Sequence, residues 1–352
     1  MIEEPTCLIL GAGASAPYGL PTTRDLRNLI LPLRSEAGAV TAARFPLKKP
    51  GRSWADGEHP ESEWNMYLHL ISEAAGFKES LPSFYAKFNG SDRSIDWFLR
   101  RHDPTFGEVA RLHIAAVLLA CEREDKLSGD WYQMLSEEIL PRNLESLEEG
   151  KLSVISFNYD RSFERYFLNQ FENLCALSPE EALTALGRIQ IVHVYGQLGT
   201  LDYVSYGASE KAHTASKQIR TVRLEPEEDV QARIGKMIRD STYINFIGFG
   251  FDEDNIHLLG PENFKGKRVY STTHGMGART RAKIQRDLGV RFLAKEPLEM
   301  KADQLLRVKD LFGPKIPPRN TSNRPSGANR PSGTSRPRIL TRPTTFQSGW
   351  DI

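Results

Sequence analysis

A glycine turn between a short apolar segment and a helix-like run constrains the fold of this chain more than any other feature. The turn reads GAGAS over residues 11–15; residues 7–10 before it are apolar, and residues 23–31 after it have a helical pattern. Strand, glycine turn and helix in this order place backbone N–H groups against a diphosphate. Glycine is required where a Cβ would keep the phosphate oxygens away. The pattern predicts a nucleotide-binding α/β fold that begins at this strand.

The bulk composition is that of an ordinary globular protein. Of the 352 residues, 39% are hydrophobic and 26% are charged, and the formal net charge is +1. A chain this close to neutral gives no reason to expect nucleic acid as the main ligand. The sequence has neither an uninterrupted apolar run of about 20 residues nor a signal-peptide pattern, so we expect a cytoplasmic protein without a membrane span.

The cysteines bear on both the compartment and the metal chemistry. Cys7, Cys121 and Cys175 are scattered and odd in number, which is typical of a reducing compartment and of a chain without a disulfide framework. Three cysteines cannot build a four-cysteine zinc site. We therefore expect no bound metal.

Short apolar segments alternate with helical ones along residues 1–313, which we take as one nucleotide-binding domain. The apolar segments are rich in β-branched and aromatic residues, as strands buried on both faces of a parallel sheet are. The pattern predicts a Rossmann-like, doubly wound α/β fold. The predicted strands are 6–10, 152–156, 189–195, 243–248 and 268–272, and the predicted helices between them are 23–31, 161–171, 226–240 and 279–287.

The interval from about residue 35 to about residue 150 is too long for a single crossover between two strands. Helical periodicity recurs over 63–75, 94–101, 106–124 and 131–140. We interpret the interval as a large helical insertion. Residues 48–60 are rich in Pro, Gly and charge, and we expect a mobile loop there.

Residues 314–352 differ from the rest of the chain in composition. They are rich in Pro, Ser and Arg and contain the repeat NRPSGANRPSG at 323–333. A segment of this kind cannot bury enough apolar area to offset the entropy of ordering, so we predict a disordered tail. The alternative is a contact arm for an acidic partner, with Phe346 and Trp350 as anchors.

Two later strand ends carry polar residues where an open parallel sheet binds its ligands. The first reads SFNYD at 156–160. Its Asn158 and Asp160 are suited to reach a ribose or an amide, although Asp160 is equally well explained as a helix N-cap. The second reads IVHVYGQLG at 191–199, and its His193 and Tyr195 are expected on one face of the strand. A neutral His there suits a general base near pH 7; the alternative is a buried His bonded to backbone.

A third strand end reads GFGFDEDN at 248–255. Gly248 and Gly250 would let the chain pass close to a ligand, while Asp252 or Asp254 caps the next helix. A weaker segment, 271–275, carries polar residues that suit an adenosine pocket or an ordinary loop.

Taken together, these motifs resemble the SIR2-like proteins, the superfamily that contains the sirtuins. The resemblance rests on GAGAS followed by GLP at 19–21, on NYD at 158–160, on YG at 195–196 and on GFGFD at 248–252. SIDWFL at 94–99 is similar to a recurring segment of the bacterial branch. The resemblance extends in order from residue 6 to residue 310 and leaves the tail outside.

The resemblance implies NAD binding in an inverted-type Rossmann fold and attack at the ribose C1′ that bears nicotinamide. It implies that the glycine turn holds the diphosphate, that Asn158 holds the nicotinamide ribose or a water, and that Asp160 contacts the nicotinamide amide. Residues 22–25 correspond to a flexible loop over the nicotinamide. The NAD-binding residues carried over are Gly11, Ala12, Gly13, Ser15, Thr22, Arg24, Asp160, Gly248, Gly250 and Asp252.

Two departures from the family pattern refine the expectation. The deacylases carry a four-cysteine zinc module that this chain cannot build, so the resemblance points to the zinc-free branch, which is similar to NAD-cleaving bacterial antiphage effectors. The family's catalytic His directly precedes a glycine, where this chain has Tyr195. A neutral Tyr, with a pKa near ~10, is a poor base at pH 7. The candidate catalytic residues are therefore Asn158, His193 and Tyr195, with His193 favoured as the base.

Two functions remain open, and a third fits less well. The first is an NAD glycohydrolase with NAD as its substrate, which acts in antiphage defence after a trigger, as a homo-oligomer or with a partner protein. The second is a non-catalytic module that senses NAD or an ADP-ribose derivative through a protein partner, and Tyr195 favours it. A dehydrogenase fits less well, because no second strand ends in an acidic residue about 20 residues after the glycine turn.

Overall fold

The structure is a computed structural model, and it describes residues 2, 4–31, 61–91, 93–140, 151–220, 228–291 and 301–306. All of these residues belong to one compact unit, Met1–Lys315. The loop expected at 48–60 and the tail expected at 314–352 lie outside the described residues.

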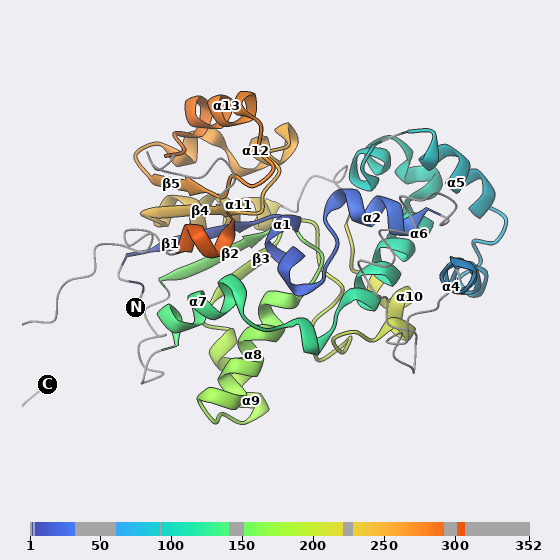
Figure 1. Ribbon diagram of the computed structural model, residues 1–352, viewed down its shortest axis with the longest axis horizontal. Coiled ribbons are helices and arrows are strands. Elements are labelled where there is room, and N and C mark those ends of the chain that lie inside the picture. Colours follow the sequence, from blue (N-terminus) through green and yellow to red (C-terminus); the bar gives the residue numbers. More distant parts are fainter. Residues whose placement is uncertain are drawn as a thin grey trace, which may run out of the picture. The chain divides into compact units, whose positions relative to one another are not determined.

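Five parallel strands form a single sheet in the order β3-β2-β1-β4-β5 (Figure 1). The central strand β1 places Leu8 between Val154 of β2 and Asn245 of β4. The chain first builds the β2–β3 side and then crosses to β4, so the connections diverge between β1 and β4, where α/β sheets bind ligands. The α/β fold with a parallel sheet is thereby confirmed. The strands are β1 (Thr6–Leu10), β2 (Leu152–Ser156), β3 (Gln190–His193), β4 (Tyr243–Ile247) and β5 (Arg268–Ser271).

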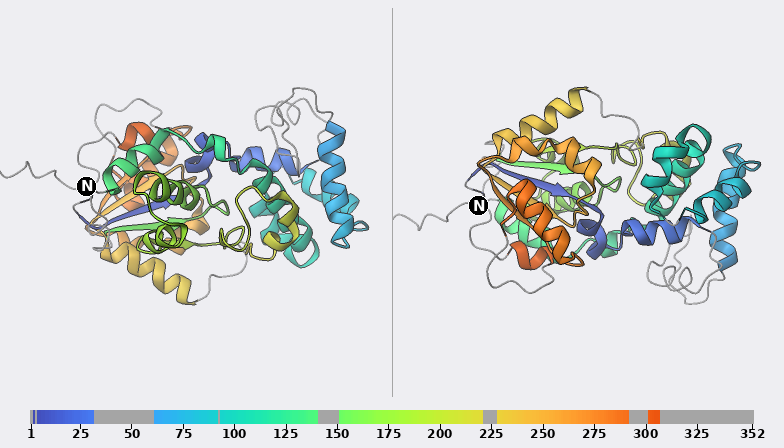
Figure 2. Two further views of the ribbon diagram at one scale, coloured as in Figure 1. Left: turned by 90° about the horizontal axis from the view of Figure 1, so that it is seen from below. Right: turned by 90° about the horizontal axis from the view of Figure 1, so that it is seen from above.

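Helices cover both faces of this sheet, because successive side chains of each buried strand point to opposite faces. Ile9 and Ile155 enter one apolar core with α11, α12 and α13, whereas Leu8 and Val154 enter a second core with α7, α8, α9 and α14. Figure 2 shows α11 on one side of the strands and α7 and α14 on the other. The bounds of these helices are α7 (Asp130–Ile139), α8 (Ser162–Leu174), α9 (Pro179–Leu186), α11 (Glu228–Asp240), α12 (Glu253–Leu259), α13 (Ala278–Leu288) and α14 (Ala302–Leu306).

The remaining helices gather around α6 (Ile95–Cys121), which packs against α2 (Thr23–Ile30), α4 (Glu61–Ala74), α5 (Leu81–Asn89) and α10 (Ala212–Ser216). The prediction of two separate helices at 94–101 and 106–124 is wrong, because α6 runs through Pro104 without a break. The side chains on either side of the proline enter one core, with the rings of Phe98 and Phe106 6.0 Å apart. This packing offsets the backbone hydrogen bond that proline cannot donate.

Among the described helices, α6 is long and apolar enough to cross a membrane by length and composition alone. However, 78% of its apolar window is buried inside the protein. Burial to this extent is also typical of a helix at the centre of a large core.

The third strand is shorter than predicted. It ends at His193, and Val194 and Tyr195 form a turn in which the Gly196 N–H donates to the His193 carbonyl at 3.3 Å. Gly196 has φ 71°, and the N–H of Arg220 donates to the carbonyl of Tyr195 at 2.8 Å. The backbone therefore leaves the sheet two residues early. The expectation that His193 and Tyr195 share one strand face is wrong for this reason.

Candidate functional site

The two glycine loops that follow β1 and β4 are packed against each other. The N–H groups of Gly11 and Gly13 donate to the carbonyls of Ile247 and Gly248, both at 3.0 Å. A Cβ on Gly11 would lie 2.6 Å from the Gly248 oxygen, and one on Gly248, whose φ is 59°, would lie 2.0 Å from the Ala14 nitrogen. These glycines are required because two backbones touch, and not only because a ligand approaches.

This packing changes the expectation of bare N–H groups on the first turn. Gly11 and Gly13 use theirs on the β4 loop, and the N–H of Ala14 donates to the Gly11 carbonyl at 2.8 Å. Ala12 is the first residue of α1 (Ala12–Ser15), so its N–H has no acceptor within the helix. Ala12 is thus the residue of this turn suited to donate to a phosphate.

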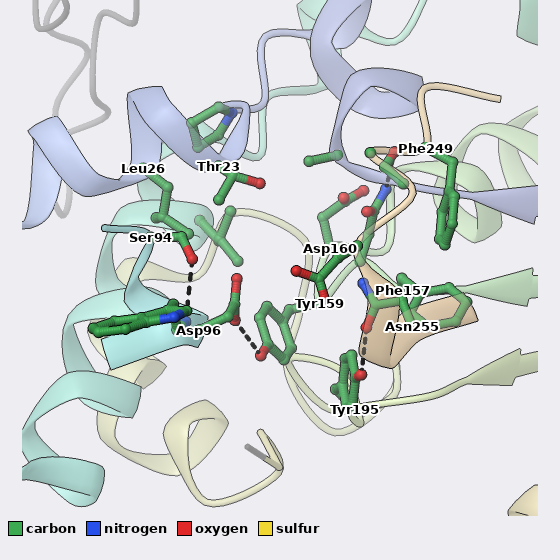
Figure 3. Close-up of a pocket in the computed structure, with 18 of the residues that line it drawn as sticks. Thr23, Leu26, Ser94, Asp96, Phe157, Tyr159, Asp160, Tyr195, Phe249 and Asn255 are labelled. Carbon is green, nitrogen blue, oxygen red and sulfur yellow. Dashed lines mark hydrogen bonds between the residues drawn. The ribbon is translucent and has the colours of Figure 1, made fainter. Parts of the chain in front are cut away.

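A cavity of about 200 Å³ opens at the carboxyl ends of the strands. Four strand ends contribute to it: Gly11 and Ala12 after β1, residues 157–160 after β2, Tyr195 after β3, and residues 249–250 after β4. Helices α2 and α6 form the facing wall (Figure 3). Segments that are far apart in the sequence therefore meet around one space.

Asn158 lines the cavity and is itself buried. Its Nδ2 donates to the Gly11 carbonyl at 2.9 Å and to the Ser15 hydroxyl at 3.1 Å. Because the Gly11 carbonyl only accepts hydrogen bonds, this contact determines which way the amide points. The Oδ1 of Asn158 is consequently the atom available to accept a hydrogen bond from a ligand or a water.

Asp160 both lines the cavity and caps a helix. Its Oδ1 accepts hydrogen bonds from the Ser15 hydroxyl at 3.1 Å, from the Ser162 N–H at 3.1 Å and from the Ser162 hydroxyl at 2.5 Å. Burial raises the pKa of Asp160 above its ordinary value, although the bonds from Ser162 and Ser15 act in the opposite direction. The two explanations of this residue, capping and lining, therefore hold together.

His193 lies behind Asn158 and is not among the residues that line the cavity. One ring nitrogen, Nδ1, lies 2.9 Å from the Asn158 carbonyl, and Nε2 lies 2.6 Å from a carboxylate oxygen of Glu164. Burial acts to lower the pKa of His193, whereas the Glu164 carboxylate and the Asn158 carbonyl act to raise it. Together these two groups outweigh burial, so the pKa of His193 is raised above its ordinary value. His193 thus contacts the backbone of Asn158 and does not face the cavity.

Tyr195 does line the cavity, and its hydroxyl is engaged there. The hydroxyl donates to the Oδ1 of Asn255 at 2.6 Å. Burial raises the pKa of Tyr195 far above neutral. The phenol consequently stays protonated at pH 7 and is a hydrogen-bond donor, not a base.

Helix α6 supplies part of the wall that the sequence analysis did not assign. Ser94 caps the helix by accepting from the Trp97 N–H at 3.1 Å, and Asp96 follows in the first turn. The Tyr159 hydroxyl donates to Asp96 at 3.1 Å, and burial raises the pKa of this carboxyl group. Arg100, one turn further along, pairs with Asp252 at 2.9 Å and with Asp254. The signal was the SIDWFL segment, which contains Asp96 and comes just before Arg100.

Several of the other predicted residues have structural partners, whether or not they also line the cavity. Thr22 and Asp25 form a capping box at the start of α2, and Asp252 is the N-cap of α12 while also lining the cavity. The Thr272 hydroxyl accepts from the Gly248 N–H at 2.9 Å, so the segment 271–275 supports the glycine loop. The predicted residues that line the cavity are Gly11, Ala12, Asn158, Asp160, Tyr195, Gly250 and Asp252, and those that do not are Gly13, Ser15, Thr22, Arg24, His193 and Gly248.

Within the described part of the chain, no group of three or more His, Cys, Asp or Glu side chains is arranged to hold a metal ion. Comparison with protein-family models gives no match, and no curated protein matches the chain.

Proposed function

We propose that this protein is a SIR2-like NAD glycohydrolase, which cleaves NAD to nicotinamide and ADP-ribose. The observation that carries the proposal is the meeting of four strand ends around one cavity that both Asn158 and Ala12 line. Doubly wound sheets bind dinucleotides at such a place. Ligand pockets commonly have volumes of about 300–1,000 Å³, so a cavity of about 200 Å³ suits the nicotinamide and its ribose, not the whole dinucleotide.

In the proposed reaction, a water oxygen bonds to C1′ while the bond from C1′ to the nicotinamide nitrogen breaks. Nicotinamide leaves with the electron pair as a neutral molecule, and the water loses one proton. Asn158 accepts a hydrogen bond from the water or the ribose through Oδ1. Asp160, two residues further on, is the carboxylate we assign to receive the proton, because its raised pKa brings it closer to neutral pH.

This assignment replaces the histidine we favoured from the sequence. A general base must lie within hydrogen-bonding reach of the proton it removes, and His193 lies behind Asn158. His193 and Glu164 instead act as positioning residues for the turn that carries Asn158. An antiphage role, a defence partner or a homo-oligomer, and a cytoplasmic location belong to the same proposal and rest on the resemblance.

A second function is favoured by one observation. Among the described residues that line the cavity there is no histidine, and the Tyr195 hydroxyl is bound to Asn255. A site of this kind also suits a module that binds NAD or an ADP-ribose derivative without cleaving it and signals to a protein partner.

The first prediction separates these functions. Pure protein is incubated with NAD, and released nicotinamide is measured. We expect Asn158→Ala to reduce release by about 10²-fold or more, because water and ribose lose their hydrogen-bond acceptor. Asn173→Ala is the matched control, since Asn173 lies on the exposed side of α8 and donates to the Asn169 carbonyl.

Release at the wild-type rate by Asn158→Ala would show that the site assignment is wrong. If the protein binds NAD but releases no nicotinamide, even after a partner protein is added, the result would support the non-catalytic module.

A further inference from the structure

Aromatic side chains form much of the cavity wall. Phe157, Tyr159, Tyr195 and Phe249 come from three strand ends, and Trp97 comes from α6. The ring of Phe157 lies 5.8 Å from that of Tyr195 and 5.0 Å from that of Phe249, both edge to face. Aromatic ring faces carry negative charge density and attract cations, including quaternary nitrogen groups.

Carboxylates outnumber cations on the same wall. Asp96, Asp160 and Asp252 line the cavity, and Arg100 is the basic residue among its described lining residues. Arg100 is already paired with Asp252 and with Asp254. Within the described ranges, no basic side chain lies at ion-pair distance from Asp96 or Asp160, although the charge of Arg100 acts to lower the pKa of Asp96. Two carboxylates therefore line the cavity without a cation in direct contact.

The environments of these two carboxylates differ. Asp160 accepts three hydrogen bonds from Ser15 and Ser162, which stabilise its charged form locally. Asp96 accepts one side-chain hydrogen bond, from Tyr159. Burial raises the pKa of both groups, which means that each charge is costly in the free protein. A bound cation would offset that cost, and most of all at Asp96.

We infer that Asp96 is a specificity-determining residue, which makes this cavity select a permanently cationic ring. Figure 3 shows Asp96 on α6, across the cavity from Asp160. The inference deepens the proposed function and rests on it for the identity of the ligand: the oxidised nicotinamide of NAD is an N-substituted pyridinium cation. Reduced nicotinamide has no such charge and would be disfavoured.

The charge preference is measured without the dinucleotide, using two small probes. Nicotinamide is neutral, and 1-methylnicotinamide carries the same ring and amide with a permanent positive charge. We expect the wild-type protein to bind the cation on the order of tenfold more tightly. We expect Asp96→Asn to reduce this preference to about threefold or less, because it removes the charge and keeps an oxygen that can accept from Tyr159. Ligand-observed NMR titration measures both affinities.

A matched control variant isolates the charge. Asp103→Asn makes the same substitution on the same helix, where Asp103 pairs with Arg111 at 2.8 Å outside the cavity, and should leave the preference unchanged. Circular dichroism confirms that each variant is folded.

The inference is overturned if the wild type fails to bind the cation or binds both probes equally well, or if Asp96→Asn keeps the full preference. These outcomes are distinct from failure of the proposed function. A protein that prefers the cation but never releases nicotinamide from NAD would contradict the hydrolase alone. One that hydrolyses NAD without any charge preference would contradict the inference alone.

Discussion

Gly248 and Gly250 in the loop after β4 serve different purposes, although the sequence motif makes them look alike. Gly248 has φ 59° and has no room for a side chain, since the Ala14 nitrogen would lie 2.0 Å from its Cβ. Gly250, two residues later, has no atom within 4 Å of the place a Cβ would take, and it lines the cavity. One glycine is required by the fold, and the other borders open space in the cavity.

The second prediction follows from this difference. We expect Gly248→Ala to lower the free energy of unfolding by about 2–4 kcal/mol, from the left-handed backbone and the clash with the first loop. Gly250→Ala should change it by no more than about 0.5 kcal/mol. Urea unfolding of both variants is the measurement. Equal midpoints would contradict the tight packing of the two loops.

At the scale of elements, a buried ion pair joins the end of α6 to the start of α8. Glu122 follows the last residue of α6 and Arg161 precedes the first residue of α8. The guanidinium contacts both carboxylate oxygens, at 3.1 and 2.5 Å, and both side chains are almost fully buried. Arg161 also donates to the carbonyls of Gly199, Val204 and Ser205. This pair ties the loop after β3 to the two helices.

Breaking this pair gives the third prediction. Arg161→Met leaves a buried carboxylate without its cation, and we expect a loss of about 3–5 kcal/mol in the free energy of unfolding. Arg165→Met is the matched control one turn along α8, where Arg165 pairs with the exposed Glu124. That pair should contribute less than about 1 kcal/mol. Similar losses in the two variants would contradict the importance of burial.

At the scale of the whole molecule, groups with raised pKa values collect around the cavity. Burial raises the pKa of Asp96 and Asp160, and Glu164 raises that of His193 against the effect of burial. A group with a raised pKa in the folded state binds more protons there than in the unfolded chain. Its contribution to stability is present below its unfolded pKa, about 3.9 for Asp and 6.5 for His. That contribution is lost as pH rises through the folded pKa.

The fourth prediction concerns this pH dependence. Asp96→Asn should match the wild type in free energy of unfolding below about pH 4, where both side chains are neutral. It should be more stable than the wild type at pH 8, because it lacks the costly buried charge. Urea unfolding across this pH range measures the difference. A difference that does not grow with pH would contradict the burial cost of Asp96.

The convergence of the strand ends could be anticipated because it follows from topology. Parallel strands end at the same edge of a sheet, so Gly11, Asn158 and Gly250 were expected to lie near one another, and they line the same cavity. The separation of His193 from Tyr195 could not be anticipated. It depends on where β3 ends, and at that point the carbonyl of Tyr195 accepts from the N–H of Arg220, which is remote in sequence.

The sequence alone determined the order of strands and helices and the glycine turns between them, because periodicity and backbone preference act over a few neighbouring residues. Tertiary structure alone decided which side chains face the cavity. Asp96 and Arg100 reach it because α6 packs against α2 beside the sheet edge. His193 was turned away by its bonds to Asn158 and Glu164. Contacts of this kind join residues dozens of positions apart, and no local pattern encodes them.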